Sequence, residues 1–312
     1  MQSKKKILIA LDGSPDSLGA TRYVARTCNP AILKVDLLHV MPTAPETFWD
    51  QEKDIYFKEK MKTNYHEWQK STKKAAQLFL DDAKNILINA GLATSEVGTI
   101  IQERKAGIAR DIVAESTRGY DAVVVGRRGW SKLADLFLGS VSNKVAEGIR
   151  DVTVWVVGRD IRSDRMLVAV NASKNSRKAV DYAGTFARGA EVDLTLFHVV
   201  RKLGFEFMDG VNLRDEEIDG FMEQVERDTR RMLTSYKNSL EKAGVAPEKI
   251  STKRTLGSYT RAGDILTEAQ DGGYGTIVMG RRGLSKVHEF IMGRVTNKVL
   301  HRAQGFAVWI VP

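Results

Sequence analysis

The sequence predicts an α/β protein built from two tandem, doubly wound parallel sheets of five strands each. The chain of 312 residues is longer than one ordinary α/β domain, and its length fits two domains of about 150 residues each. The second half of the chain repeats the order of apolar and helical segments found in the first half. Most expected strands are continuous β-branched runs, which is typical of parallel strands that helices cover on both faces.

An internal duplication sets the number of domains. Residues 120–157 and 274–311 are identical at 16 of 38 positions without a gap. A repeat of this length indicates two copies of one structural unit. We therefore expect one domain over residues 1–158 and a second over residues 164–312, joined by a short charged linker.

Each half follows one order of elements: strand, helix, strand, long helix, strand, helix, strand, glycine loop, helix and strand. In the first half the expected strands cover residues 7–11, 35–40, 96–102, 122–125 and 153–157. Strands separated by helical crossovers form right-handed βαβ units and a doubly wound sheet. Such sheets bind ligands beyond the carboxyl ends of their strands, where the winding reverses. Asp12 and Gly126 both follow such strand ends.

Composition restricts the class of protein. The net charge of +9 makes nucleic acid a partner to consider, because a basic surface attracts phosphate backbones. However, 48 basic residues are interleaved with 39 acidic ones, so we interpret the charge as a mildly basic, solvated surface and do not expect nucleic acid. The single cysteine, Cys28, excludes an internal disulfide framework. The apolar run at 7–11 is too short for a signal peptide and no run reaches transmembrane length, so we expect a cytoplasmic protein without a membrane partner.

Two glycine loops carry the strongest local signal. In the first half, Gly126-Arg127-Arg128-Gly129 is followed after nine residues by Gly139-Ser140; in the second, Gly280-Arg281-Arg282-Gly283 is followed after nine by Gly293-Arg294. Glycines let backbone N–H groups approach an anion, and a helix N-terminus adds unpaired donors and a positive dipole end. The pattern therefore predicts a phosphate cradle in each half. The alternative is that the glycines only form turns and that Ser140 only caps a helix.

Asp12 is an acid placed where a polyphosphate would lie. A lone carboxylate repels phosphate, so Asp12 suggests a bridging Mg²⁺ or Mn²⁺, since both prefer carboxylate and phosphate oxygens. Its alternative role is an Asx turn or helix cap within residues 12–17. Arg127 and Arg128 could neutralise phosphate, but adjacent side chains on an extended backbone cannot both face one site. At least one of them is expected to point to solvent.

The strand ending at Asp12, the strand ending at Val40 and the G-x2-G-x9-G-S pattern together resemble the universal stress protein family. The likeness covers the whole chain as two tandem modules, whose fold relatives include adenine-nucleotide α-hydrolases and electron-transfer flavoproteins. It implies that adenine lies near Asp12 and Val40, and that ribose and phosphates lie on the glycine loop and the next helix start. The implied cofactor is ATP or another adenine nucleotide, with Mg or Mn at Asp12. The positions that match are Ala10, Leu11, Asp12, Val40, Gly126, Arg127, Gly129, Gly139, Ser140, Val141 and Ser142, then Val170, Asn171, Val199, Gly280, Gly283, Gly293, Arg294, Val295 and Thr296.

The second half departs from the first where charge matters. Asn171 stands in place of Asp12, and Arg294 stands in place of Ser140, while Thr296 keeps a hydroxyl. A neutral amide is a poorer metal ligand than a carboxylate, whereas an arginine brings its own positive charge. Two outcomes stay open: a metal-independent nucleotide site, or a site that the arginine fills.

The favoured function is an ATP-binding regulatory protein of the stress-response type, with little or slow turnover. The sequence contains no Walker lysine motif, no G-x-G-x-x-G and no H-E-x-x-H. His39 and His198 recur at matched positions late in the second strand of each half. We interpret them as packed strand residues and not as general bases.

Two alternatives come from other classes of protein. A nucleotide-independent scaffold would pair the apolar last strands, 152–157 and 306–311, within one chain or between two chains, and these strands share Trp155 and Trp309. The other alternative is an ATP-hydrolysing or adenylating enzyme. Residues 12–17 faintly resemble the S-G-G-x-D-S loop of ATP pyrophosphatases, although Asp12 and Ser14 break that pattern.

Overall fold

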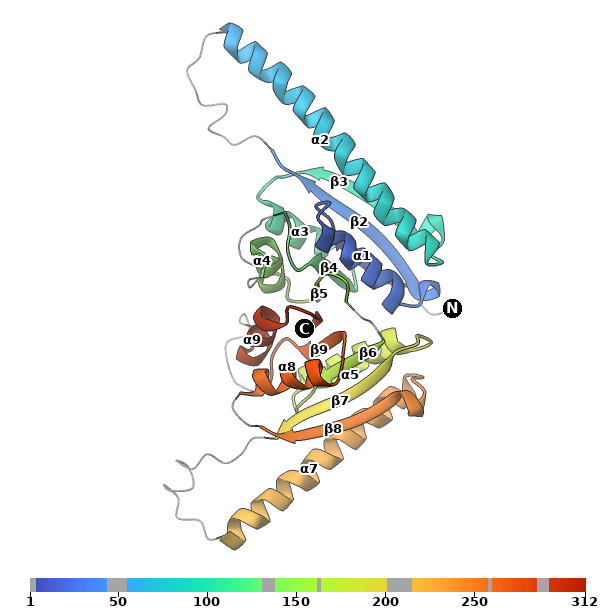
Figure 1. The fold of residues 1–312 in the computed structure, drawn as a ribbon, viewed down its shortest axis with the longest axis vertical. Coiled ribbons are helices and arrows are strands. Elements are labelled where there is room, and N and C mark those ends of the chain that lie inside the picture. The colour runs from blue at the N-terminus through green and yellow to red at the C-terminus, as the bar shows by residue number, and fades with distance from the viewer. Residues whose placement is uncertain are drawn as a thin grey trace. The chain divides into compact units, whose positions relative to one another are not determined.

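The computed structural model contains two compact units, one formed mainly by the N-terminal half of the chain and one mainly by the C-terminal half (Figure 1). The structure describes residues 4–43, 55–130, 138–161, 164–200, 215–257, 260–284 and 292–312.

The first unit alternates strands and helices in the expected order. Its elements are β1 (Lys5–Ala10), α1 (Pro15–Thr27), β2 (Leu33–Met41), α2 (Ile55–Asn89), β3 (Val97–Glu103), α3 (Ile108–Ser116), β4 (Ala122–Gly126), α4 (Ser140–Gly148) and β5 (Thr153–Val157). Every strand agrees with its predicted range to within two residues at either end. The largest shifts are at β1 and the start of β2, because lysines at these positions continue the extended backbone before the apolar run begins.

The second unit repeats this order. Its elements are β6 (Arg165–Ala169), α5 (Lys174–Ala187), β7 (Asp193–Val200), α7 (Asp215–Lys242), β8 (Ile250–Leu256), α8 (Arg261–Asp271), β9 (Thr276–Gly280), α9 (Arg294–Arg302) and β10 (Ala307–Val311). In Figure 1 the long helices α2 and α7 each run beside the outer strands of their own unit.

All strand pairs within each unit are parallel, which confirms the predicted doubly wound fold. The order is β3-β2-β1-β4-β5 in the first unit and β8-β7-β6-β9-β10 in the second. Ile9 of β1 lies opposite Leu37 of β2 on one side and Val124 of β4 on the other. The winding therefore reverses between β1 and β4, and likewise between β6 and β9, which is where such sheets bind ligands.

Helices cover both faces of each sheet. In the second unit α5 packs on α7 and on β9, whereas α8 packs on α9. Right-handed crossovers place these two helix pairs on opposite faces, because the chain moves outward through β7 and β8 and then returns to β9. Consecutive residues such as Ile7, Leu8 and Ile9 are all fully buried. Burial on both faces explains why the strands are continuous apolar runs.

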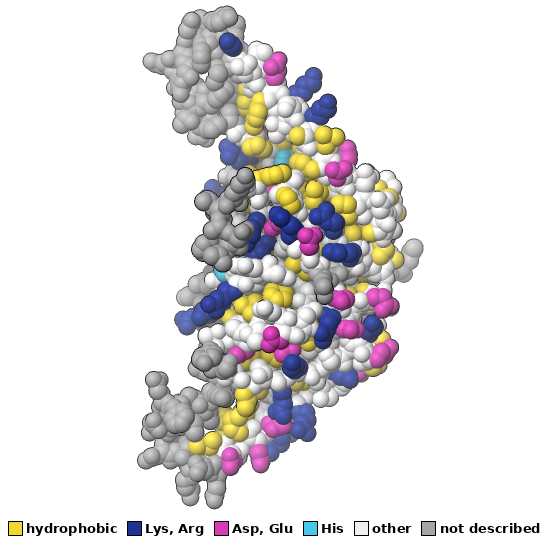
Figure 2. All heavy atoms as spheres, viewed as in Figure 1, with side chains coloured by type: hydrophobic (Ala, Val, Ile, Leu, Met, Phe, Trp, Pro, Cys, Tyr) yellow, Lys and Arg dark blue, Asp and Glu magenta, His cyan; other side chains and the backbone are white. Residues whose placement is uncertain are grey.

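The surface carries charges of both signs. On the face drawn in Figure 2, Lys and Arg side chains lie among Asp and Glu side chains. Among the residues that the structure describes, none of the helices combines the length and the apolar character that a bilayer span requires.

Replacing Trp155 tests how much the stability of the first unit depends on one buried side chain. It is fully buried on β5 and meets the ring of Tyr23 edge to face, with the ring centroids 6.3 Å apart. We expect Trp155→Ala to lower the free energy of unfolding by about 3 to 5 kcal/mol, because it removes a large buried side chain and leaves a cavity. Chemical unfolding followed by circular dichroism measures this loss.

The matched control is Trp68→Ala, because Trp68 is 41% exposed on α2. We expect that variant to lose less than about 1 kcal/mol. Equal losses in the two variants would contradict the packing described for Trp155.

Candidate functional site

The carboxyl ends of β1 and β4 bring Asp12 and the first glycine loop together. A Cβ added to Gly129 would come within 2.5 Å of Oδ2 of Asp12. Gly126 lies against the start of α1, where an added Cβ would be 2.8 Å from the backbone nitrogen of Ser17. Close approach of two backbones thus requires glycine at 126, whereas a Cβ at 129 would meet only the side chain of Asp12. The loop folds over Asp12 as the position of β1 beside β4 predicts.

The start of α4 offers backbone donors at the end of this loop. Gly139 is the N-cap, with φ −59° and ψ 143°, and its N–H donates to the carbonyl of Arg127 at 3.0 Å. The first bond inside the helix runs from Asn143 to the carbonyl of Gly139. The N–H groups of residues 140–142 therefore precede the hydrogen-bonded part of the helix, as the first donors of any helix do.

A side-chain cap is missing from α4 within the described part of the chain. By contrast, Ser14 and Ser173 accept hydrogen bonds from the first turns of α1 and α5, and Thr260 does so for α8. The equivalent helix of the second unit, α9, begins like α4, at Gly293 without a side-chain cap. Within the described residues, the two helices that follow the glycine loops thus have no side-chain cap for their first donors, and these donors and the positive dipole end favour an anion.

The hydroxyl groups near these helix starts have different roles. The family resemblance placed Ser140 and Ser142 at the helix start where ribose and phosphates were expected to lie. Ser142 is buried, and its Oγ donates to the carbonyl of Gly126 at 2.7 Å. Thr296 does the same in the second unit, donating to Gly280 at 2.9 Å. These two hydroxyls brace the loops, whereas the side chain of Ser140 is exposed.

Arg127 and Arg128 diverge, in agreement with the expectation that they cannot both face one site. Arg127 is 1% exposed, and Arg128 is partly exposed. Burial lowers the pKa of Arg127 to about 10, the charge of Arg128 adds to this decrease, and the carboxylate of Asp16 opposes it. The backbone N–H of Arg127 donates to Val157 at 2.6 Å. Arg127 therefore ties the loop to β5 and keeps a positive charge inside the unit.

Asp12 forms the Asx turn that the sequence analysis gave as its alternative role. Its Oδ1 accepts a hydrogen bond from the N–H of Ser14 at 2.9 Å, which forms an Asx turn. Its Oδ2 is directed at Gly129, as the 2.5 Å approach to an added Cβ shows. The side chain is exposed. One oxygen of the carboxylate thus holds the turn while the other faces the loop.

Asn171 is held differently in the second unit. Its Oδ1 accepts from the N–H of Ser173 at 2.9 Å and from the hydroxyl of Ser176 at 3.0 Å. Its Nδ2 faces the second loop, 3.0 Å from where a Cβ on Gly283 would lie. The first loop therefore meets a carboxylate oxygen, which attracts cations, and the second meets an amide donor, which suits an anion.

The paired histidines make matching bonds to the backbone in the two units. The Nδ1 of His39 donates to the carbonyl of Leu11 at 2.7 Å, and His198 donates to Val170 at the same distance. These bonds fix the chain just beyond β1 and β6. Neither ring nitrogen that makes them is available as a general base.

The remaining predicted residues lie around the same strand ends. Leu11, Val40, Val170 and Val199 are buried, whereas Ala10, Val141 and Val295 are half-buried. Arg294, the first residue of α9, is exposed. The parts of the loop spacers at 131–137 and 285–291 lie outside the described residues.

Three aromatic residues at the two loops escaped the sequence reasoning. Trp130 is 68% exposed, and its Nε1 donates to the carbonyl of Asp12 at 2.9 Å. The ring of Phe79 touches Gly13, and Tyr236 donates to the carbonyl of Asn171 at 2.8 Å. Trp130 could have been noticed because the first loop differs from the second in having Trp130 where the second has a leucine. No local pattern connects the other two residues to the loops.

Comparison with known proteins identifies the fold and the family. The sequence model of the universal stress protein family matches residues 4–157 and, a second time, residues 162–312. The chain belongs to the universal stress protein family. The tandem arrangement of universal stress protein domains is thereby shown as well.

Individual universal stress proteins agree with this assignment. Universal stress protein YxiE of Bacillus subtilis is 30% identical over 139 residues, which are 44% of this chain and 90% of that protein. Universal stress protein Mb2019 of Mycobacterium bovis is 27% identical over 211 residues, 65% of each chain. The crystal structure of a universal stress protein from Archaeoglobus fulgidus has a TM-score of 0.65 at 21% identity, covering 98% of this chain and 97% of that one. At that identity the structure supports the fold alone.

His198 of this universal stress protein predicts a pH dependence of stability. Burial lowers the pKa of His198 below its ordinary value, the charge of Arg261 adds to the decrease, and the bond to Val170 opposes it. The unfolded chain therefore binds a proton that the folded chain does not, so stability is full above the ordinary histidine pKa and falls as pH drops through the folded one. We expect the second unit to lose stability as the pH falls below the ordinary histidine pKa of about 6.5.

The control is His198→Asn, which removes the titrating ring. Chemical unfolding above and below this pKa should show a shallower pH dependence in the variant than in the parent protein. Equal slopes would mean that His198 does not contribute.

Proposed function

We propose that this universal stress protein is an ATP-binding regulatory protein that holds an adenine nucleotide on the glycine loop of its first unit, with little or slow turnover. The observation that carries the proposal is the uncapped start of α4 beside a loop whose glycines approach Asp12. Backbone donors, glycine and a helix dipole together form an anion site at the switch point of the sheet.

The phosphates would lie against the N–H groups of residues 140–142 and the hydroxyl of Ser140. A hydrogen bond to a charged oxygen contributes about 1.5 to 3 kcal/mol. The adenine and ribose would lie toward Asp12 and the ends of β1 and β2, where Leu11 and Val40 provide buried apolar surface behind the site.

Asp12 suits a divalent cation that is shared with a nucleotide. One carboxylate oxygen is taken by the turn, and the other faces the loop. Mg²⁺ is often bound through one or two carboxylates together with phosphate oxygens and water. The described residues include no group of three or more acids, histidines or cysteines able to hold a metal. The cation would therefore depend on the nucleotide for most of its ligands.

The second unit would bind a nucleotide without such a metal. Asn171 presents an amide donor to its loop in place of a carboxylate, and Arg294 brings a positive charge to the start of α9. Arg294 is exposed and does not fill buried space. This supports cation replacement over the alternative in which the arginine occludes the site.

Low turnover follows from the surroundings of the first loop. His39 is engaged with Leu11, and the Oδ1 of Asp12 is engaged with Ser14. A dedicated base would need to lie within hydrogen-bond reach of the attacking water. In the described chain, His39 and His198 donate through Nδ1 to the carbonyls of Leu11 and Val170, and we propose uncatalysed, slow hydrolysis as the limit of activity.

The sharpest test uses Gly129→Ala. A Cβ at this position would meet only the flexible carboxylate of Asp12, whereas one at Gly126 would press on the backbone of α1 and disturb the fold. We expect Gly129→Ala to weaken ATP binding in Mg²⁺ by about tenfold, because it displaces the carboxylate that faces the phosphates. Calorimetric titration, with identification of any nucleotide released on denaturation, measures this effect.

Gly283→Ala is the matched control, because it makes the same change opposite Asn171 in the second unit. We expect it to leave Mg²⁺-dependent ATP binding unchanged. Absence of ATP binding in the parent protein, or equal losses in the two variants, would argue against the proposal and in favour of a scaffold.

The scaffold remains the second candidate, with pairing through the last strands of one chain or two. Trp155 and Trp309 do not support it by themselves, because each packs in its own unit. Trp155 meets Tyr23, and Trp309 meets Tyr182 and Phe186. We keep this pairing, the domain limits 1–158 and 164–312 and a cytoplasmic location as proposals.

A further inference from the structure

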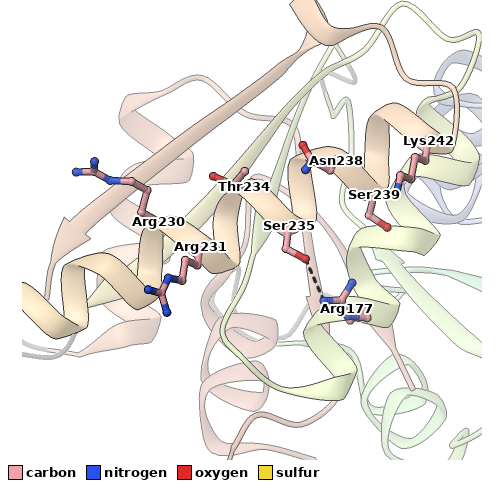
Figure 3. A pocket seen from close by; sticks show the side chains of 8 residues that line it. All are labelled: Arg177, Arg230, Arg231, Thr234, Ser235, Asn238, Ser239 and Lys242. Carbon is pink, nitrogen blue, oxygen red and sulfur yellow. Dashed lines mark hydrogen bonds between the residues drawn. The ribbon is translucent and has the colours of Figure 1, made fainter.

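A groove of about 560 Å³ lies between α5 and α7 of the second unit, and its lining includes no residue of the glycine loops. Arg177 projects into it from α5, while Arg230 and Arg231 lie toward one end of the α7 segment and Lys242 toward the other (Figure 3). The other lining residues carry hydroxyl or amide groups. Neither an acidic nor an apolar side chain lines the groove.

The basic groups are only weakly neutralised. Arg177 donates to the hydroxyl of Ser235 at 3.3 Å, which leaves its charge uncompensated by that bond. Arg231 approaches Asp228 no closer than 3.9 Å. The described chain provides no ion pair for Lys242. Surface pairs of this kind contribute little, so an incoming anion would not have to displace strong partners.

Acidic residues border the groove and limit the extent of its positively charged surface. Arg230 pairs with Glu226 at 3.2 Å, but Glu226 also binds Arg254 at 2.6 Å. Asp181 of α5 accepts a hydrogen bond from Ser239 at 2.7 Å. These carboxylates lie outside the lining, so the lining itself keeps a net positive charge.

The groove is built on rigid elements. Leu233, Tyr236 and Leu240 anchor α7 in the core of the unit, and Gly184 of α5 lies so close that an added Cβ would be 2.9 Å from Leu240. Arg177 also stacks over the ring of Tyr236, 5.1 Å from its centroid. The backbone positions from which the basic side chains extend are therefore set by packed helices and not by a loop.

The corresponding face of the first unit lacks this character. The ends of the long helices align at Gly91 and Gly244, which both adopt positive φ. In this alignment Leu78 occupies the position equivalent to Arg231. Asp81 and Asp82 occupy the positions equivalent to Thr234 and Ser235.

The helices α1 and α5 align at their capping serines, Ser14 and Ser173. Leu18 then stands for Arg177. The duplication thus conserved the fold while one copy acquired a basic face. A general requirement for solubility or for packing does not explain a difference between two copies of one fold.

We propose that this groove binds a small anion that carries several phosphate groups. Arginine, lysine, hydroxyl and amide groups are the donors that phosphate oxygens accept from, and Arg binds them through two donors at once. Arg231 and Lys242 are eleven residues apart, or about 17 Å along the axis of α7. One phosphate group cannot reach both, whereas a chain of phosphates can. The lining shares no residue with the proposed nucleotide loops, although Arg177 stacks on Tyr236, whose hydroxyl donates to the carbonyl of Asn171.

A single-stranded nucleic acid fits less well. Proteins that bind single strands without sequence preference stack bases on exposed aromatic rings, and the groove lining contains none. Tyr236 is buried under Arg177. The occupant is therefore expected to be recognised through phosphate alone.

Calorimetric titration with inorganic tripolyphosphate tests the proposal. We expect Arg177→Gln/Arg231→Gln to weaken binding by at least about tenfold, because two charge-assisted contacts are lost. Arg230→Gln/Arg231→Gln should behave in the same way and keeps the stack on Tyr236, which guards against a folding defect. The matched control is Lys73→Gln/Lys74→Gln, which removes two exposed charges from α2, and it should bind as the parent protein does.

Three outcomes would overturn the proposal. The first is no binding of tripolyphosphate by the parent protein, or equal binding by inorganic phosphate. The second is binding that Gly129→Ala abolishes and the groove variants retain, which would place the anion on the glycine loop. The third is tighter binding of a single-stranded oligonucleotide, lost in the groove variants, which would make the occupant a nucleic acid.

Discussion

The close approach of β4 to the start of α1 is the constraint on which the site depends. Gly126 ends β4, and any Cβ there would lie 2.8 Å from the nitrogen of Ser17 and 2.9 Å from the carbonyl carbon of Asp16. Gly280 meets Asn175 of α5 at the same distance of 2.8 Å. Because glycine lets the two backbones touch, the loop after β4 can lie over the turn after β1. Without that contact, the start of α4 and the side chain of Asp12 would not lie on the same side of the loop.

Within this shared frame the two units differ in charge rather than in backbone. The first loop faces a carboxylate of Asp12, and the second faces the amide of Asn171. The second unit also carries a basic groove on α5 and α7, where the first has leucines and aspartates. Both differences make the second unit more positively charged than the first. Duplication followed by exchange of a few exposed side chains accounts for them, since such exchanges leave the core and the stability of the fold nearly unchanged.

The fold was predictable because its signals are local. Buried runs such as 7–9, the glycines that end β4 and β9, and the serine caps of α1 and α5 all act within a few residues. The roles of side chains were less predictable where they depend on contacts distant in sequence. Ser142 was expected to face an anion, yet its hydroxyl reaches back to Gly126. Trp130 reaches Asp12 across 118 residues of sequence, and Arg177 meets Ser235 across 58. Only the packed structure brings these pairs together.

The two glycine loops have the same backbone arrangement, but nucleotide binding should depend on a cation only at the first. The most direct measurement is the occupancy of each loop in crystals grown with ATP, either with Mg²⁺ or with a chelator. Removal of the cation should lower the occupancy of the first loop, where Asp12 faces Gly129, and leave the second loop unchanged. Equal responses at both loops, or nucleotide at neither, would contradict this prediction.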